Sequence, residues 1–488
     1  MEALTPDQGK DWGGFWHKVR MELPTIFVLT MLVSWMGALG WFRGFETWHL
    51  DTFIRLRGRE MSQNISIVEI TDKDYVDFFG GTSPLDKSRL LDLIRAVQSY
   101  NPSVIGVDID TKDWGLACVK NKNDASIAQK CGEIDTKLNQ LRAAELAPPG
   151  TTKKRSSIVW AAVPKTLEPP LQLTNGPGSL PLKPDSAGIP RFPVDEDGSV
   201  RHFERRVEVA KGSDGCPGEG ETCYLPTFAQ AILQKYKSPA AGASDERVIF
   251  NFYGDRYRFP IIDSRQFLVA ANPEGGTKED LDNQNEELDQ SRRALFDGKI
   301  VLIGGSFVEA RDEYFTPIGP MQGVELNALA IQTDLSGGGI RDINQYGEFV
   351  LDLCISIFIV AVFYFYGTRP WVALGISSSV VPLALISSLI LFDSFAYWFS
   401  FIPIAVGLTI HQLTHLAEEQ SEAQKEVQEL QRGRNEVEIE VARVQEMVVA
   451  ENGEVVIDEV EVIEATSAMD KESPVDDPKV KGAAGGAG

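Results

Sequence analysis

Four long runs of apolar residues divide the chain. The run at 24–42 contains no charged side chain, and the run at 349–367 contains only Asp352. A helix needs about 20 mostly apolar residues to cross the ~30 Å hydrocarbon core of a bilayer, and each run reaches or approaches that length. The last three runs are separated by no more than two residues, which leaves no polar face for a soluble helical bundle. We therefore predict transmembrane helices at residues 24–42, 349–367, 370–392 and 394–412.

The first run has an alternative interpretation as a cleaved signal peptide, because Ala38-Leu39-Gly40 resembles a small-x-small cleavage site. Its apolar stretch is longer than the roughly 7–15 residues of a signal-peptide core, so we favour an uncleaved anchor. Four spans place both termini on the same side of the membrane. Lys18 and Arg20 precede the first run, which favours a cytoplasmic N-terminal segment at residues 1–23.

The residues between the first and second runs, 43–346, are enough for one large domain. Short β-branched runs alternate there with stretches whose apolar residues recur at helical spacing. The predicted strands are 65–70, 104–108, 158–162, 248–252 and 300–304, and the predicted helices are 88–100, 228–236 and 323–332. This alternation predicts an α/β domain with a largely parallel sheet.

Cysteine placement predicts where this domain lies. Four cysteines fall within it, namely Cys118, Cys131, Cys216 and Cys223, whereas Cys354 falls in the second apolar run. An even number of cysteines in one domain suggests the local disulfides Cys118–Cys131 and Cys216–Cys223 in an oxidising compartment. Other pairings and free thiols are the alternatives. The disulfide interpretation places the domain outside the cytoplasm.

Four acidic residues follow two of the predicted strands. Asp72 and Asp74 come after strand 65–70, and Asp108 and Asp110 lie at the end of strand 104–108. The carboxyl ends of neighbouring parallel strands form the usual ligand edge of such sheets, so we expect these residues to lie together as a candidate site for a cation or cationic ligand. Solvated acids at a sheet edge are the alternative. The five histidines show no metal-ligand spacing. We predict neither a metal centre nor a cofactor.

Two further patterns suggest chemistry. Asp108, Asp110 and Thr111 match the opening motif of haloacid-dehalogenase phosphatases, in which the first aspartate attacks phosphorus, whereas the alternative is that these acids cap a turn. Gly-Gly-Ser at 304–306 follows a strand but lacks the lysine and glycine spacing of a phosphate-binding loop, so we predict a tight turn rather than an anion site. We assign no catalytic residue and expect that the protein is not an enzyme.

Residues 413–450, after the last apolar run, repeat apolar side chains at heptad spacing with glutamate-rich flanks. This pattern predicts a coiled coil continuous with the fourth span, and a single solvated helix is the alternative. The predicted interface residues are Leu416, Val427, Leu430, Val437, Val441 and Val444. Residues 451–488 are predicted to form an acidic, mostly disordered tail.

Net charge narrows the function classes. The 488 residues include 70 Asp and Glu against 47 Lys and Arg, which gives a formal net charge of −23. A nucleic-acid-backbone binder needs a basic face, so we predict no nucleic-acid partner. From position 416 onward there are 19 acidic and 7 basic side chains. The mean hydropathy of −0.13 therefore averages apolar membrane segments with a strongly acidic end, and does not indicate a soluble protein.

Several segments resemble a single family. Residues 296–305 contain Gly-Lys-Ile-Val-Leu-Ile-Gly, and residues 312–325 match the pattern D-x-x-x-TP-x-G-PM-x-GVE. The pair Asp51-x-x-x-Arg55 and the segments 104–108 and 195–201 support the match. From about residue 51 to 342, and through the spans that follow, the chain resembles bacterial membrane proteins with a type-two CHASE domain. That domain is an extracytoplasmic sensory domain of bacterial receptors.

The resemblance implies a sensor in the bacterial inner membrane, with the large domain extracytoplasmic and both termini cytoplasmic. Relatives usually carry a kinase or cyclase after their spans, and residues 413–488 are too few for either. We therefore expect a separate cytoplasmic partner. We also expect the membrane helices to contact the lipid bilayer, and copies of the chain to associate through the membrane helices and the cytoplasmic coiled coil. A structural subunit of a membrane assembly and an extracytoplasmic hydrolase are the alternatives. Residues 80–86 depart from the family's usual Trp-Pro-Arg segment, and the resemblance implies no ligand.

Overall fold

The computed structural model forms two compact units, residues 1–409 and 410–488. The structure describes residues 12–57, 62–83, 85–109, 129, 132–133, 136, 156–163, 186–210, 222–236, 247–252, 259–268, 289–342, 345–366, 370–400 and 402–451. Predictions for Asp110, Cys118, Cys131, Cys216 and the tail 452–488 lie outside the described residues.

A six-stranded sheet forms the centre of the large domain, with every strand pairing parallel. Its order is β4-β3-β2-β10-β1-β9. The strands are β1 (Ile65–Ile70), β2 (Val104–Asp108), β3 (Ser157–Ala161), β4 (Ala187–Gly188), β9 (Ile261–Asp263) and β10 (Ile300–Gly305). The predicted α/β fold with a largely parallel sheet is confirmed.

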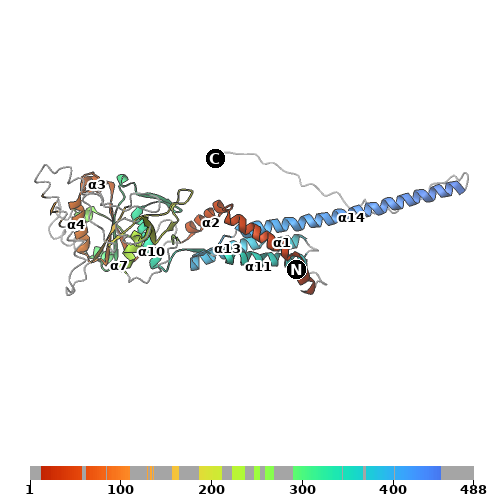
Figure 1. Ribbon diagram of the computed structural model, residues 1–488, viewed down its shortest axis with the longest axis horizontal. Coiled ribbons are helices and arrows are strands. Elements are labelled where there is room, and N and C mark those ends of the chain that lie inside the picture. Colours follow the sequence, from red (N-terminus) through yellow and green to blue (C-terminus); the bar gives the residue numbers. More distant parts are fainter. Residues whose placement is uncertain are drawn as a thin grey trace, which may run out of the picture. The chain divides into compact units, whose positions relative to one another are not determined.

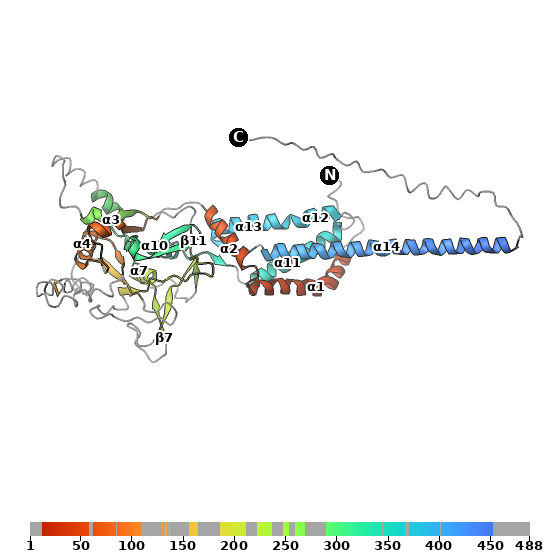
Figure 2. The same cartoon turned by 90° about the horizontal axis from the view of Figure 1, so that it is seen from above.

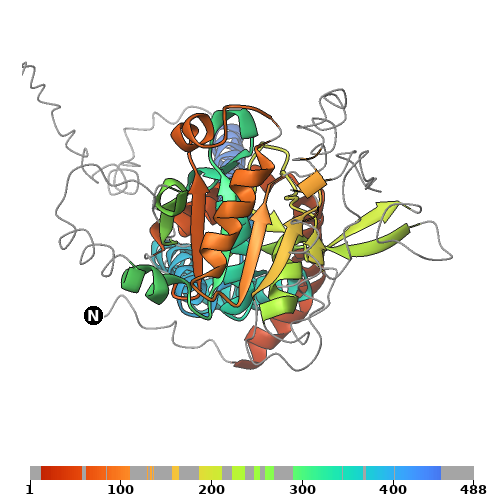
Figure 3. The same ribbon diagram turned by 90° about the vertical axis from the view of Figure 1, so that its left-hand side faces the viewer.

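Helices cover both faces of this sheet, which is why its central strands are continuously apolar. Helix α4 (Lys87–Gln98) packs on one face, where Val68 and Ile303 belong to its hydrophobic cluster. Helices α7 (Phe228–Tyr236) and α10 (Gly323–Leu335) pack on the other face, with Ile67 and Leu302. Figure 3 shows α4, in orange, in front of the sheet. Alternate residues of each strand therefore enter two separate cores.

Three small antiparallel pairs lie beside the main sheet. They are β5 (His202–Phe203) with β8 (Val248–Ile249), β6 (Arg206–Ala210) with β7 (Thr222–Pro226), and β11 (Glu313–Thr316) with β12 (Gly319–Gln322). The predicted strand 248–252 is shorter than expected and covers Val248–Ile249; after it, the Phe250 amide still donates to the Arg201 carbonyl in the same register, and the Asn251 amide donates to the Thr333 hydroxyl. Edge strand β9, at three residues, was too short for its periodicity to predict.

The two cysteines that the structure describes differ in state. Cys223 on β7 is disulfide-bonded, and Cys354 is a free thiol. The predicted pairings stay predictions, because the other three cysteines lie outside the described residues.

The first unit also contains a group of apolar helices: α1 (Trp12–Ala38), α11 (Gln345–Tyr366), α12 (Pro370–Ser378) and α13 (Val380–Phe395). Helices α1 and α11 run antiparallel, since Phe15 contacts Phe365 and Phe27 contacts Phe349 (Figures 1 and 2). Among the described residues, two helical segments are long and apolar enough to cross a membrane, Phe349–Tyr366 and Trp371–Phe395. Crossing by the first and fourth predicted spans stays a prediction.

The predicted spans 370–392 and 394–412 have different bounds in the structure. A break at Ser379 separates α12 from α13, and Pro382 in the first turn of α13 has no amide hydrogen to continue the earlier helix. Helix α13 runs on to Phe395 and ends at Ala396, whose φ of 54° is left-handed. Next, β14 (Tyr397–Trp398) pairs with β13 (Arg341–Asp342). The following helix therefore begins at Ile402, eight residues later than predicted.

Helix α14 (Ile402–Glu451) is 50 residues long and forms the described part of the second unit. Pro403 lies in its first turn, where proline is tolerated. The helix continues through Gly433 without a break. Of the six predicted interface residues, the structure describes four side chains, and all four are exposed: Val427, Leu430, Val437 and Val441.

Candidate functional site

The structure divides the four predicted site residues between two environments. Asp72 and Asp74 begin the short helix α3 (Asp72–Asp77) directly after β1. The Asp72 carboxylate accepts a hydrogen bond of 2.8 Å from the Val308 amide. The fully buried Asp74 accepts 2.9 Å from the Ser264 hydroxyl and pairs with the Arg265 guanidinium at 3.1 Å. These two carboxylates bond to protein donors and hold α3 against neighbouring loops.

Asp108 lies in a different group, at the carboxyl end of β2. Its side chain accepts a hydrogen bond of 2.8 Å from the Asn327 amide of α10. Asp312, which precedes β11, is close enough to act on it electrostatically. Burial and the charge of Asp312 raise the pKa of Asp108 to about 7. We call Asp108, Asp312, Tyr314 and Asn327 the carboxyl pocket.

Burial also raises the pKa of the other two ionisable side chains of the carboxyl pocket, Asp312 and Tyr314. Burial raises the pKa of Asp312, and the hydrogen bond from Tyr314 opposes that shift. Burial raises the pKa of Tyr314 as well, and both carboxylates add to the effect. Two carboxyl groups in low dielectric cannot both ionise at low cost, so the pocket favours a shared proton or a positively charged guest.

Glycines allow the first turn of α10 to approach the pocket. A Cβ on Gly323 would collide with the Asp312 carboxylate, and a Cβ on Gly304 would lie 2.6 Å from the Val324 Cβ. The predicted turn at 304–306 is instead the end of β10, where Gly305 pairs with Ile70 and the Ser306 amide donates 3.0 Å to the Ile70 carbonyl. These glycines therefore serve close packing rather than a turn.

Sequence reasoning missed Asp312 and Asn327 as site residues. Asn327 is a polar residue, 2 % exposed, in the otherwise apolar run of α10. That interruption is the only local signal that could have identified it. Asp312 begins a recognisable segment, but nothing local indicates that it meets β2, more than two hundred positions earlier.

A cluster of ion pairs around Arg201 connects the large domain to α2 (Arg43–Leu56), the helix that follows α1. The Arg201 side chain is 4 % exposed and forms paired bonds of 2.8 and 2.9 Å with Asp51 of α2. It also bonds to Asp195 at 3.0 Å and to Asp197 at 2.7 Å. Hydrogen bonds from Arg201 lower the pKa of Asp197 to about 2. A buried, multiply bonded arginine thus joins α2 to the domain.

The β11–β12 hairpin connects this junction with the carboxyl pocket. Arg55 of α2 donates 2.8 Å to the Pro317 carbonyl at the tip of the hairpin. The Phe315 carbonyl on β11 accepts 2.7 Å from the Val200 amide, next to Arg201. At the base of the hairpin, the Asp312 carbonyl accepts 2.8 Å from the Gly323 amide. One short hairpin therefore contacts the pocket at its base and α2 at its tip.

The same α2 helix contacts the end of α13, which belongs to the candidate membrane span Trp371–Phe395. Phe53 packs against Phe392 with ring centroids 5.5 Å apart, and His49 lies 6.0 Å from the Trp398 ring. The Arg57 guanidinium lies 5.5 Å from the Phe392 ring and also donates to Asn251 in the domain. Helix α2 is thus bonded to the domain and packed on the end of α13.

The segment that leaves the domain, β13, also contacts the chain at the end of α13. Strand β13 pairs in parallel with β14, and the Arg341 amide donates 2.8 Å to the Ala396 carbonyl. The Arg341 guanidinium also bonds to the Tyr397 hydroxyl at 3.2 Å. The chain therefore contacts the C-terminal end of α13 both where it enters the domain and where it leaves it.

Comparison with known proteins identifies the family of the chain. No curated protein and no solved structure is similar to the chain. The family model for the CHASE2 domain, a sensor-type extracytoplasmic domain, matches residues 25–363, which include α2, the sheet, the hairpin and most of α11. An extracytoplasmic domain of this type implies a membrane location. The chain belongs to the CHASE2 domain family.

Proposed function

We propose that this protein is a receptor-like membrane sensor that binds a positively charged signal, or a proton, at the carboxyl pocket. The signal would change the position of the β11–β12 hairpin, and α2 would pass that change to the membrane helices. One observation carries the proposal: the hairpin supplies Tyr314 to the pocket, and Arg55 of α2 donates a hydrogen bond to the Pro317 carbonyl at its tip. The sensor-type family of the domain supports it.

The chemistry of the pocket supports the class of signal. A cation between Asp108 and Asp312 would offset the burial and the repulsion from Asp312 that together raise the Asp108 pKa. Among the residues that the structure describes, no group of three metal-ligating side chains occurs. A metal ion held only by protein groups needs more ligands than this pair provides, so an organic cation or a proton fits better.

The pocket also favours binding over catalysis. A carboxylate nucleophile must be ionised, and an Asp108 whose pKa is raised to about 7 is partly protonated near neutral pH. Its carboxyl group is also held by Asn327. We therefore propose a protein without catalytic activity of its own and regard the hydrolase as the weaker alternative.

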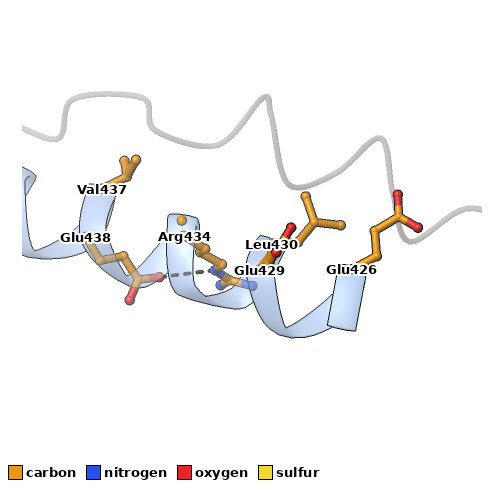
Figure 4. A pocket seen from close by; sticks show the side chains of 7 residues that line it. Glu426, Glu429, Leu430, Arg434, Val437 and Glu438 are labelled. Atoms are coloured by element: carbon orange, nitrogen blue, oxygen red, sulfur yellow. Dashed lines mark hydrogen bonds and ion pairs between the residues drawn. The ribbon is translucent and has the colours of Figure 1, made fainter. Parts of the chain in front are cut away.

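The output would come from α14 in the cytoplasm. Its exposed apolar side chains recur at heptad spacing, and Figure 4 shows Leu430 and Val437 on one side of the helix. Arg434 follows Leu430 by four residues and precedes Val437 by three, so it takes the intervening position of the seam, where it pairs with Glu438 at 3.2 Å. An apolar seam beside charged positions is typical of coiled-coil helices. We propose that two or more copies associate through this seam, and that a separate cytoplasmic partner reads the arrangement.

Hydrogen exchange of the full chain in lipid nanodiscs tests the relay. Asp108→Asn removes the repulsion in the pocket and imitates its neutral state. We expect changed exchange in residues 313–322 and, together with it, in α2. Asp92→Asn, on the exposed face of α4, is the matched control and should change neither. Adding Arg55→Ala to the first variant should confine the change to the hairpin.

The same preparation tests the signal. Calcium, magnesium and a polyamine are added separately, and pH is varied between about 5 and about 8. We expect a polyamine or acid to alter exchange at the hairpin and α2 in the natural chain but not in Asp108→Asn. If none of these conditions alters either segment and the oligomer stays constant, the protein is a structural subunit of a membrane assembly instead.

A further inference from the structure

Helix α2 carries a row of exposed aromatic side chains. Phe45 and Trp48 on the helix and Trp41 just before it are 65 %, 65 % and 69 % exposed. The spacing of three residues places Phe45 and Trp48 on one side of α2, and Trp41 lies in the turn that leads into the helix. Large aromatic side chains with two-thirds of their surface uncovered need a partner that the described residues do not supply.

The side chains on the opposite side of α2 are buried against the domain. Leu50, Phe53 and Ile54 are at most 5 % exposed and belong to the main hydrophobic cluster of the domain. The same cluster contains Phe392 and Trp398 from the end of the α13 region. Burial on that side and the ion pair of Asp51 fix the rotation of α2, so the aromatic row faces away from the domain and from α13.

The position of α2 along the membrane helices identifies what covers the row. The apolar segment Trp371–Phe395 ends at Phe395, and Phe392 in its last turn contacts α2. Figure 2 shows α2 beside the end of α13 that is distant from α12. Helix α1 ends at Ala38, three residues before Trp41. The aromatic row therefore lies at the level where the membrane helices leave the hydrocarbon core.

We propose that this side of α2 lies in the headgroup region of the outer leaflet, with Trp41, Phe45 and Trp48 inserted among the lipids. Tryptophan concentrates at this depth because its ring is apolar and its N–H remains hydrated. An amphipathic helix with one apolar side lies in the plane of such an interface. The lipid surface is continuous with that around α1 and α13, whereas a second copy would have to cover a strip only one helix wide.

This anchor gives α2 a further role, because the helix is then held by the bilayer surface, the domain and α13 together. Lipid packing in the outer leaflet would bear directly on the helix that joins the domain to the membrane segment. The inference does not depend on the carboxyl pocket, and it holds for a structural subunit as well as for a sensor.

Spin-label accessibility in vesicles tests the anchor. The full chain with Cys354→Ala, and with any other reactive cysteine replaced until the background takes up no label, receives Phe45→Cys. It is reconstituted in vesicles of phosphatidylethanolamine and phosphatidylglycerol. Val76→Cys on α3 is the matched control, since Val76 is 62 % exposed and lies on the domain. Collision rates with oxygen and with a water-soluble nickel chelate are measured at both positions.

We expect the label at position 45 to collide more with oxygen than with nickel, and the label at position 76 to show the reverse. Nickel accessibility at position 45 equal to that at position 76 would overturn the proposal, because the row would then face water. Low accessibility to both reagents, with spin–spin broadening that disappears on dilution by unlabelled protein, would overturn it in favour of a second copy.

Discussion

Replacement of Arg201 by methionine removes the guanidinium that joins α2 to the domain while keeping a long side chain. Arg201 donates five hydrogen bonds, to Asp51, Asp195 and Asp197. Its own side chain is 4 % exposed, so water cannot replace those bonds unless the site opens. The substitution leaves three carboxylates facing one another around an apolar side chain.

The expected cost follows from the exposure of the partners. Removal of one member of a buried ion pair typically costs about 3–5 kcal/mol. Asp197 is 47 % exposed and loses little, because solvent screens its charge. Asp51, 16 % exposed, loses the guanidinium with which it pairs, whereas Asp195, 20 % exposed, keeps its ion pair with Arg247. We therefore expect the lower end, about 3 kcal/mol, from Arg201→Met. With an unfolding entropy of about 2.1 cal/mol/K per residue over a domain of about 300 residues, that corresponds to a fall of about 5 °C in the unfolding midpoint.

Thermal unfolding of the full chain in detergent, followed by circular dichroism, measures this fall. Arg247→Met is the matched control, since Arg247 also binds Asp195, at 2.8 Å, but is 48 % exposed. Exposed pairs contribute about 0–1 kcal/mol, so the control should barely shift the midpoint. Hydrogen exchange should also rise in α2 for Arg201→Met alone. Small and equal shifts of the unfolding midpoint in both variants would refute the argument that the buried Arg201 holds α2 on the domain.

Three further predictions concern the sheet, the carboxyl pocket and α14. Gly304→Val should destabilise the domain by about 1–3 kcal/mol in chemical unfolding, because its side chain meets Val324; unchanged stability would contradict the close packing of α10. The pKa of Asp108 in the folded chain is raised to about 7, so the folded chain binds one more proton than the unfolded chain between about pH 4 and about pH 7. Its stability should therefore fall as pH rises through that range. Asp108→Asn should abolish this pH dependence of the unfolding midpoint. Leu430→Asp should reduce the oligomer mass measured by light scattering in detergent, and an unchanged mass would argue against the seam. Gly433→Ala should instead stabilise helix α14 by about 1 kcal/mol.

Local periodicity predicted most of the central sheet. The strands β1, β2, β3 and β10 are each within one residue of their predicted bounds, since buried parallel strands read as short continuous apolar runs. Helix α4 was equally accessible, because its apolar stripe repeats at helical spacing and Asp86 caps its start. The short strands β9 and β14 were not, because two or three residues are too few to show a period.

The site was less predictable, because strand order is not a local property. Asp72 and Asp108 follow strands that both pair with β10, as the sheet argument requires. The α3 capping geometry, however, directs Asp74 toward Thr71 and Ser264, and Asp72 bonds to the Val308 amide. Asp108 instead meets residues that arrive from beyond β10. No spacing in the sequence indicates that meeting, whereas a parallel sheet with α10 packed on it produces it.

The residues that carry the family resemblance meet at the membrane junction. Asp51 bonds to Arg201, and Arg55 bonds to the Pro317 carbonyl, so three separate segments of the pattern join at α2. Gly304 and Gly323 in the same pattern set how closely α10 approaches β10 and Asp312. A shared ligand is not needed to explain such a pattern. What these contacts preserve is the attachment of α2, the hairpin and α10 to one another, and a sensor can change its signal while keeping that attachment.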